Sequence, residues 1–147
     1  MIGEKDSKIV AALMRDGRAS VVEISDQIGL PRTTVQQRIR KMVDEGVIRK
    51  FTAVPDFSKL GRGVTAYVLV SFSGDDRLSE RSVAEGLAAI DEVTEVSLVS
   101  GEWDMLLKVR AGSVEEIGSL VIDKLRMMKG VGKTQTCLCF QTVKEEP

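Results

Sequence analysis

Histidine is absent from this 147-residue sequence, and cysteine, proline and aromatic residues are scarce. Without histidine the chain lacks the commonest general base and metal ligand, so no Ser–His or Cys–His nucleophile pair can form. The two cysteines, Cys137 and Cys139, stand one residue apart, on one face of a strand, and have no further soft ligand to complete a zinc site. We expect both to be small buried residues, and we expect no metal, no cofactor and no enzymatic activity.

Long apolar runs are missing as well. The longest candidate is the short stretch 64–72, well below the ~20 residues that a membrane helix needs. The first residues turn charged at once and lack the apolar stretch of a signal peptide. We therefore expect a cytoplasmic protein with no membrane partner.

Charge is distributed unevenly along the chain. Up to Arg62 there are 12 Lys and Arg against 8 Asp and Glu, a net charge of +4, whereas from Gly63 onward 9 stand against 14, a net charge of −5. A basic first half joined to an acidic second half indicates that only the first half meets a polyanion.

Three short helices are predicted within the first 46 residues. Asp6 is a candidate cap for the first, and Gly17 can end it in the left-handed conformation. The second opens with a capping box formed by Ser20 and Glu23 and stops at Gly29. The third begins at Pro31, whose missing N–H costs nothing at the first helical position, and ends at Gly46.

Two capped helices that meet across a Gly29-Leu30 turn describe a helix-turn-helix. Val35, Ile39 and Met42 form the buried stripe of the third helix, and no acidic residue occurs from Pro31 to Val43. Gln and Arg side chains can read base edges, and Arg and Lys also neutralise phosphate, although a solvated polar face is the plain alternative. The candidates for contact with double-stranded DNA are Arg32, Thr33, Thr34, Gln36, Gln37, Arg38, Arg40 and Lys41.

The rest of the chain predicts a different architecture. A strand over 47–54 ends at Pro55, and the glycine-containing segment after it suggests a hinge. Strands are predicted over 64–72, 93–100, 105–109 and 134–143, with one helix on Val83, Leu87 and Ile90 and another opened by a second capping box, Ser113 with Glu116. This β-α-β-β-α-β order is ferredoxin-like.

The fold class is therefore α+β, with two domains. Residues 1–54 are predicted to form a helix-turn-helix DNA-binding domain with a trailing strand, 55–63 a linker, and 64–147 a ferredoxin-like βαββαβ domain. Two helices cover only one face of such a sheet, so the bare face predicts at least a dimer. Val68, Val70 and Leu98 are candidates for that bare face.

The ordered set of these motifs resembles the Lrp/AsnC (feast/famine) transcriptional regulators over nearly the whole chain. Pro31 stands where that family often has serine, and Trp103 replaces its usual tyrosine or phenylalanine. The matching pieces are Asp6, Ile9–Leu13, Asp16-Gly17-Arg18, Val35-x-x-Arg38-Ile39, Gly46-Val47-Ile48, Leu60-Gly61, Gly101-Glu102-Trp103-Asp104 and Leu106-Leu107-Lys108-Val109.

The resemblance implies a sequence-specific DNA-binding regulator that forms homodimers through open sheet faces and assembles further into octamers. It also implies that residues 64–147 serve for ligand sensing and oligomerisation, with an amino acid or similar small-molecule effector bound between dimers. Gly101–Asp104 would then be the ligand turn, although a plain β-turn has the same composition, and Trp103 could equally anchor an interface. The residues expected around the effector are Ser100, Gly101, Trp103, Asp104, Thr134 and Thr136.

An enzyme is the rival interpretation. Some proteins that resemble this family by fold act on sirohaem as decarboxylases. That chemistry uses histidine for haem handling and proton transfer, and the absence of histidine argues against it here.

Overall fold

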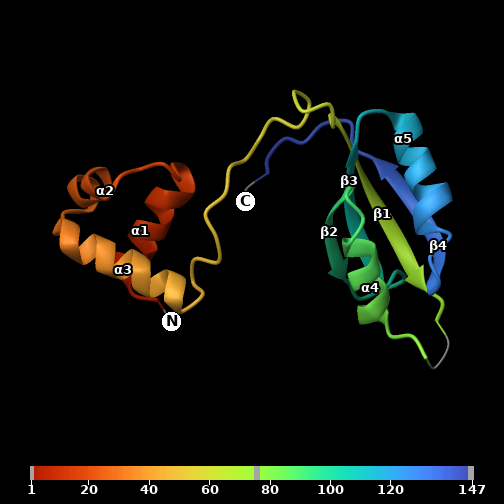
Figure 1. The fold of residues 1–147 in the computed structure, drawn as a ribbon, viewed down its shortest axis with the longest axis horizontal. Helices are drawn as coiled ribbons and strands as arrows, with labels where there is room; N and C mark the ends of the chain where they lie inside the picture. The colour runs from red at the N-terminus through yellow and green to blue at the C-terminus, as the bar shows by residue number, and fades with distance from the viewer. Residues whose placement is uncertain (1, 75–76, 146–147) are drawn as a thin grey trace. The chain divides into compact units, whose positions relative to one another are not determined.

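The chain forms two compact units that divide after Val54. Figure 1 shows helices in the first unit and a sheet with helices in the second. The computed structural model describes residues 2–74 and 77–145, so the outer ends of the predicted domains, residues 1 and 147, lie outside the described residues. The helices of the first unit are α1 (Glu4–Arg15), α2 (Val21–Ile28) and α3 (Arg32–Asp44).

The ends of α2 follow the local sequence as predicted. The Ser20 hydroxyl accepts a hydrogen bond from the Glu23 N–H at 3.2 Å, and the Glu23 carboxylate accepts one from the Ser20 N–H at 2.6 Å. This reciprocal box satisfies two N–H groups that the first turn leaves without partners. Gly29 ends the helix in the left-handed conformation, with φ of 69°, which glycine adopts without a steric penalty.

Three predicted helix boundaries are wrong. Gly3, not Asp6, precedes α1, which leaves Asp6 inside the first turn. That helix ends at Arg15, and Gly17 does not take a positive φ. Pro31 lies at the capping position before α3 rather than at its first turn.

A small apolar core holds the three helices together. Its buried members come from all three helices, and Ile9, Ile24 and Val35 are fully enclosed. Along each helix, apolar residues follow one another at a spacing of one turn and so form one apolar side. Three such sides pack together as a three-helix bundle. This packing fixes which side of α3 faces outward.

The strand predicted over 47–54 is absent. Its residues form no ladder with any strand in the described part of the chain, and Phe51 and Val54 are exposed. Strand propensity reflects packing on a neighbouring strand more than an intrinsic backbone preference, so the apolar alternation alone forms no strand here.

The second unit has the predicted β-α-β-β-α-β order. Its four-stranded sheet runs β2-β3-β1-β4, and every neighbouring pair is antiparallel. The last helical stretch changes partway from α-helix to a π-helical segment, labelled η1. The elements are β1 (Val64–Phe72), α4 (Glu80–Ala88), β2 (Val93–Leu98), β3 (Met105–Ala111), α5 (Val114–Ser119), η1 (Leu120–Leu125) and β4 (Val131–Leu138).

The start of α5 differs from the predicted capping box. The Ser113 hydroxyl accepts from the Glu116 N–H at 3.1 Å, as expected. The Glu116 carboxylate, however, accepts from the N–H of Gly112 at 2.7 Å instead of that of Ser113. The glutamate therefore anchors the loop that leaves β3 rather than completing a reciprocal box.

Among the described residues, helices cover one face of the sheet and leave the other bare. Val68 and Val70 of β1 are fully buried in a core shared with α4, α5 and η1, so their predicted place on the bare face is wrong. Side chains alternate between faces along a strand, so the bare face carries Tyr67 and Leu69 instead. Leu98 pairs with the buried Met105 and so lies on the helix-covered side, at the exposed edge strand β2.

The C-terminal end of the sheet also departs from prediction. β4 ends at Leu138, so the expected strand over 134–143 begins late and runs too far. Cys137 is exposed on the edge strand β4, and Cys139, which follows that strand, is half-buried, so the prediction of two buried cysteines is wrong.

The segment 55–63, predicted as a linker, packs against the second unit. The Arg62 guanidinium donates to the carbonyl oxygen of Asp91 at 2.8 Å, and the Phe57 ring lies under the guanidinium of Arg110. Its turn is also braced locally, because the Asp56 carboxylate accepts from the N–H of Ser58.

Candidate functional site

The polar residues predicted on the outer side of α3 are exposed there. A shallow surface pocket of about 240 Å³ is lined by four of them: Thr33, Gln36, Gln37 and Arg40. Arg32 and Lys41 are exposed as well, whereas Thr34 is half-buried. Because Val35 and Met42 anchor the opposite side in the core, these donors form one outward-facing group.

Arg38 has a partner within the domain. Its Nη1 donates to Oδ1 of Asp6 at 2.8 Å, and its Nε is buried with no hydrogen-bond partner. The hydrogen bond from Arg38 holds the pKa of the Asp6 carboxyl below its usual range. Sequence reasoning listed both residues but did not pair them, because they are 32 positions apart. Arg38 braces α3 against α1, and its contact with DNA stays a prediction.

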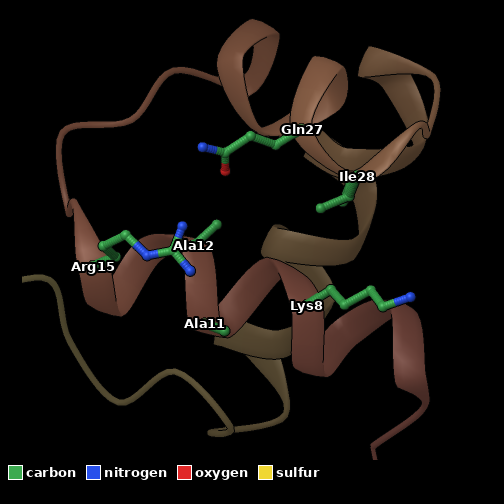
Figure 2. Close-up of a pocket in the computed structure, with 6 residues that line it drawn as sticks. All are labelled: Lys8, Ala11, Ala12, Arg15, Gln27 and Ile28. Atoms are coloured by element: carbon green, nitrogen blue, oxygen red, sulfur yellow. The ribbon is translucent and has the colours of Figure 1, made fainter.

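A second pocket, of about 350 Å³, lies between α1 and α2 (Figure 2). Lys8 and Arg15 stand toward opposite ends of α1, and Gln27 and Ile28 of α2 lie across from them. The Lys8 ammonium is 2.7 Å from the Glu4 carboxylate. Sequence reasoning did not single out this group, because the two cations also suit an ordinary solvated helix face.

The turn after β2 is held firmly to β1. The N–H of Asp104 donates to the carbonyl oxygen of Val70 at 3.1 Å, and Oδ2 of Asp104 accepts from the N–H of Phe72 at 2.7 Å. Gly101 has a φ of 120°, which side chains rarely adopt, and its missing Cβ would meet open space. No hydrogen bond among the described residues uses the Gly101 N–H.

The sheet register brings one predicted threonine to the same strand end. Thr134 of β4 pairs with Val70, on the side of β1 opposite to Asp104. Thr136 pairs with Val68, two residues further from the turn, and is exposed. Ser100 is exposed and Trp103 half-buried within the turn itself. The structure therefore gathers Thr134 and the 101–104 turn around the end of β1, with Thr136 at the margin.

No group of three or more His, Cys, Asp or Glu residues able to hold a metal ion occurs within residues 2–74 and 77–145. In the same ranges, no helix has both the length and the apolar character needed to cross a membrane.

Both halves match known families. The winged helix-turn-helix DNA-binding family matches residues 3–49, and the Lrp/AsnC ligand binding domain matches residues 65–147. The chain is 48% identical over 146 residues to an uncharacterised HTH-type transcriptional regulator of Pyrococcus horikoshii, covering 99% of this chain and 97% of that protein. This chain belongs to the Lrp/AsnC family of transcriptional regulators.

Further relatives of this Lrp/AsnC regulator agree. The proline dehydrogenase transcriptional activator of Rhizobium radiobacter is 35% identical, over 95% of this chain and 90% of its own. A crystal structure of a Neisseria meningitidis transcriptional regulator in complex with L-Met shares the fold, with a TM-score of 0.92 and 23% identity over 99% of this chain and 94% of that one. The relatives are regulators and not enzymes, and nothing supports the sirohaem decarboxylase interpretation.

Each candidate site of this Lrp/AsnC regulator lies within one of the two matches. The outer side of α3 lies within the DNA-binding match, and the 101–104 turn lies within the ligand-binding match. The chain is thus a DNA-binding transcriptional regulator with a ligand-binding domain.

Proposed function

We propose that this Lrp/AsnC regulator binds operator DNA through the outer side of α3 as a homodimer, and that an amino acid or related small molecule modulates the binding. The exposed group on α3 supports this most strongly. It combines amide and guanidinium donors with no acidic residue from Pro31 to Val43, which suits both base reading and phosphate neutralisation. The proposed DNA contacts are Arg32, Thr33, Thr34, Gln36, Gln37, Arg38, Arg40 and Lys41.

The effector is proposed to bind at the 101–104 turn. A free amino acid presents an ammonium and a carboxylate, and each needs a partner. The Phe72 N–H occupies Oδ2 of Asp104 and fixes the orientation of that carboxylate, and a carboxylate has capacity for a further donor such as the ammonium. The unused N–H of Gly101 is a donor for the ligand carboxylate.

The remaining effector contacts follow from the strand register. The Thr134 hydroxyl, across Val70 from Asp104, would assist the Gly101 N–H, and Ser100, Trp103 and Thr136 would line the margin. The L-Met complex of the Neisseria meningitidis protein, which shares this fold, adds support for an amino acid. Binding between dimers would partly exclude water and strengthen each charge-assisted bond.

The dimer is proposed to form through the bare face of the sheet, with further assembly to an octamer. Leu69 of β1 pairs with Leu106 of β3 and both are half-buried, which gives this face an apolar centre. A two-fold dimer requires an operator with two half-sites spaced near one DNA turn or a multiple of it. An effector that favours one assembly over another would change how many DNA-binding units can engage at once.

Genomic pull-down of DNA bound to the full-length protein, with and without each amino acid, tests the whole proposal. We expect recovered sites with two-fold symmetric halves and a change in occupancy with one or a few amino acids. Recovery of no preferred sequence would contradict the DNA-reading role. Identical recovery with every amino acid would contradict the effector role alone.

A further inference from the structure

Two cations follow the end of α3 in the DNA-binding unit. The side chains of Arg49 and Lys50 are exposed, and neither has a hydrogen bond or an ion pair with any residue in the described part of the chain. Lys41, in the last turn of α3, differs because its ammonium lies 3.6 Å from the Glu45 carboxylate. Arg49 and Lys50 are therefore both available to an anion outside the chain.

The turn before these cations is fixed to α3. The N–H of Gly46 donates to the carbonyl oxygen of Val43, and the N–H of Ile48 donates to that of Met42, both at 3.0 Å. Gly46 takes a φ of 72°, and the Ile48 side chain packs on the core of the three helices. Arg49 follows Ile48 directly, so its backbone begins at a defined place beside the C-terminal end of α3.

The length of α3 brings this end to the sugar-phosphate backbone of bound DNA. A recognition helix enters the major groove with its N-terminal residues toward the bases, and the groove is about 12 Å wide. The 13 residues of α3 span about 20 Å, so the helix is longer than the groove is wide. With Thr33, Gln36 and Gln37 over the bases, the C-terminal end of α3 lies over the strand that borders the groove.

Charge at that end of α3 makes additional cations necessary. Asp44 and Glu45 are exposed acids, and the carbonyl groups at a helix C-terminus carry a further partial negative charge. Phosphate groups beside this end would be repelled without compensating cations. Arg49 and Lys50 are the only cations in residues 42–54 of the sequence. They supply two positive charges where the neighbouring phosphates require them.

The segment after α3 has few contacts of its own. Residues 49–55 make no backbone hydrogen bond with any described residue, and Phe51 and Val54 are exposed. Little within the unit therefore opposes a rearrangement of this segment on DNA. The segment also leads directly to the second unit, which begins at Pro55 (Figure 1). A contact of its two cations with phosphate would thus order the connection between the units.

We propose that Arg49 and Lys50 form a second, sequence-independent contact with double-stranded DNA, in which they bind backbone phosphates beside the C-terminal end of α3 and order residues 49–54. This contact rests on the proposed insertion of α3 into the major groove. Both side chains suit the role, because a phosphate contact needs positive charge and no base-specific geometry. The contact contributes to affinity and to its salt dependence, whereas the amides of α3 contribute to sequence preference.

Fluorescence anisotropy with operator and scrambled duplexes, measured over a series of salt concentrations, tests this contact. We expect Arg49→Gln and Lys50→Gln each to reduce the slope of log affinity against log salt by ~0.9 for every DNA-binding unit engaged. Both duplexes should be weakened by the same factor, and Arg49→Lys should keep the slope because it keeps the charge. Arg15→Gln, an equal loss of charge at the pocket between α1 and α2, should leave the slope unchanged.

Hydrogen exchange gives the readout for the segment. A saturating scrambled duplex should slow exchange of the amides of residues 49–54 in the unchanged protein, and the double variant Arg49→Gln with Lys50→Gln should lose that protection. An unchanged salt slope in the folded double variant would overturn the proposal. Weaker binding to the operator alone would also overturn it, as would amides of residues 49–54 whose exchange DNA does not slow.

Variants of α3 separate this contact from the reading role of that helix. Gln36→Ala with Gln37→Ala removes amides without removing charge, so it should abolish operator preference while the salt slope stays the same. Intact preference in that variant, with a reduced slope in the double variant of Arg49 and Lys50, would contradict base reading by these amides and support the phosphate contact. Lost preference with no change of slope in the double variant would do the reverse.

Discussion

The Asp6 carboxylate accepts a hydrogen bond from Nη1 of Arg38 at 2.8 Å and so joins the first turn of α1 to the middle of α3. Both side chains are partly buried. Arg38 is flanked in sequence by Gln37, which is exposed, and by Ile39, which packs on the core, so its hydrogen bond to Asp6 reinforces the rotation of α3 that the core fixes. A residue of the first helix thus helps to hold the proposed DNA-reading side in place.

The Asp6 pair predicts a pH-dependent stability. Because Arg38 lowers the pKa of Asp6 in the folded state from its ordinary 3.8, the contribution is fully present above that pH and is lost as pH falls through the folded-state value. Asp6→Asn should therefore be less stable than the unchanged protein in urea unfolding at neutral pH, with the difference shrinking in acid. Asp26→Asn, exposed on α2, is the control and should change little. A deficit that stays constant at every pH would contradict this assignment.

The outer side of α3 gives a second prediction. The triple change Gln36→Ala, Gln37→Ala and Arg40→Ala should abolish operator preference, at ~1–3 kcal/mol for each lost base contact. Lys41→Ala should weaken all sequences alike and reduce the salt slope by about one. Fluorescence anisotropy with operator and scrambled duplexes measures both effects, and Gln141→Ala, exposed in the tail, is the control. Operator binding by the folded triple variant at unchanged affinity would show that other residues read the DNA.

Features governed by neighbours in sequence could be predicted well. The Ser20 box and the helix stop at Gly29 depend on contacts within four residues, and the apolar periodicity of α3 predicted its buried side. The strand over 47–54 failed because its stability would require a partner strand that the chain does not supply. Local propensity therefore identified elements whose partners are local.

Contacts between distant residues were the part that sequence patterns could not reveal. Asp6 was predicted to cap α1, but its carboxylate accepts a hydrogen bond from Arg38, 32 residues away in the sequence. Arg110 and Glu145 are 35 residues apart, and neither belongs to a motif, so no pattern indicated the hydrogen bond from the Arg110 guanidinium to the Glu145 carboxylate. Val68 and Val70 were assigned to the wrong face because an apolar strand read alone does not show which side the helices cover.

The corrected faces of the sheet yield a third prediction. Leu69→Arg should convert the proposed dimer to monomers at micromolar concentration, because an unpaired charge would be buried at the contact, raising the dissociation constant by ~100-fold or more. Leu98→Arg is the matched control, since Leu98 lies on the helix-covered side at the edge of β2. Sedimentation velocity distinguishes the species. Dissociation by Leu98→Arg but not by Leu69→Arg would place the contact elsewhere, and a monomeric unchanged protein would exclude the dimer.

The last prediction separates two roles of Asp104. Its carboxylate receives the Phe72 N–H at 2.7 Å, a bond within the fold, and is also the proposed acceptor for the effector ammonium. Asp104→Ala removes both functions, so it should lower effector affinity and also the free energy of unfolding by ~0.5–1.5 kcal/mol. Asp104→Asn keeps an acceptor for Phe72 but loses the charge, so it should retain most of the stability while binding the effector about tenfold more weakly.

Calorimetric titration of the three proteins against the amino acids measures the effector affinities, and urea unfolding measures the stability. Effector-free DNA binding should be nearly unchanged in both variants, because the turn belongs to the ligand-binding region and not to α3. Equal effector affinity in Asp104→Asn and the unchanged protein would remove the Asp104 charge from the site. If no amino acid bound to any of the three, the 101–104 segment would be a plain turn whose carboxylate serves only to anchor the end of β1.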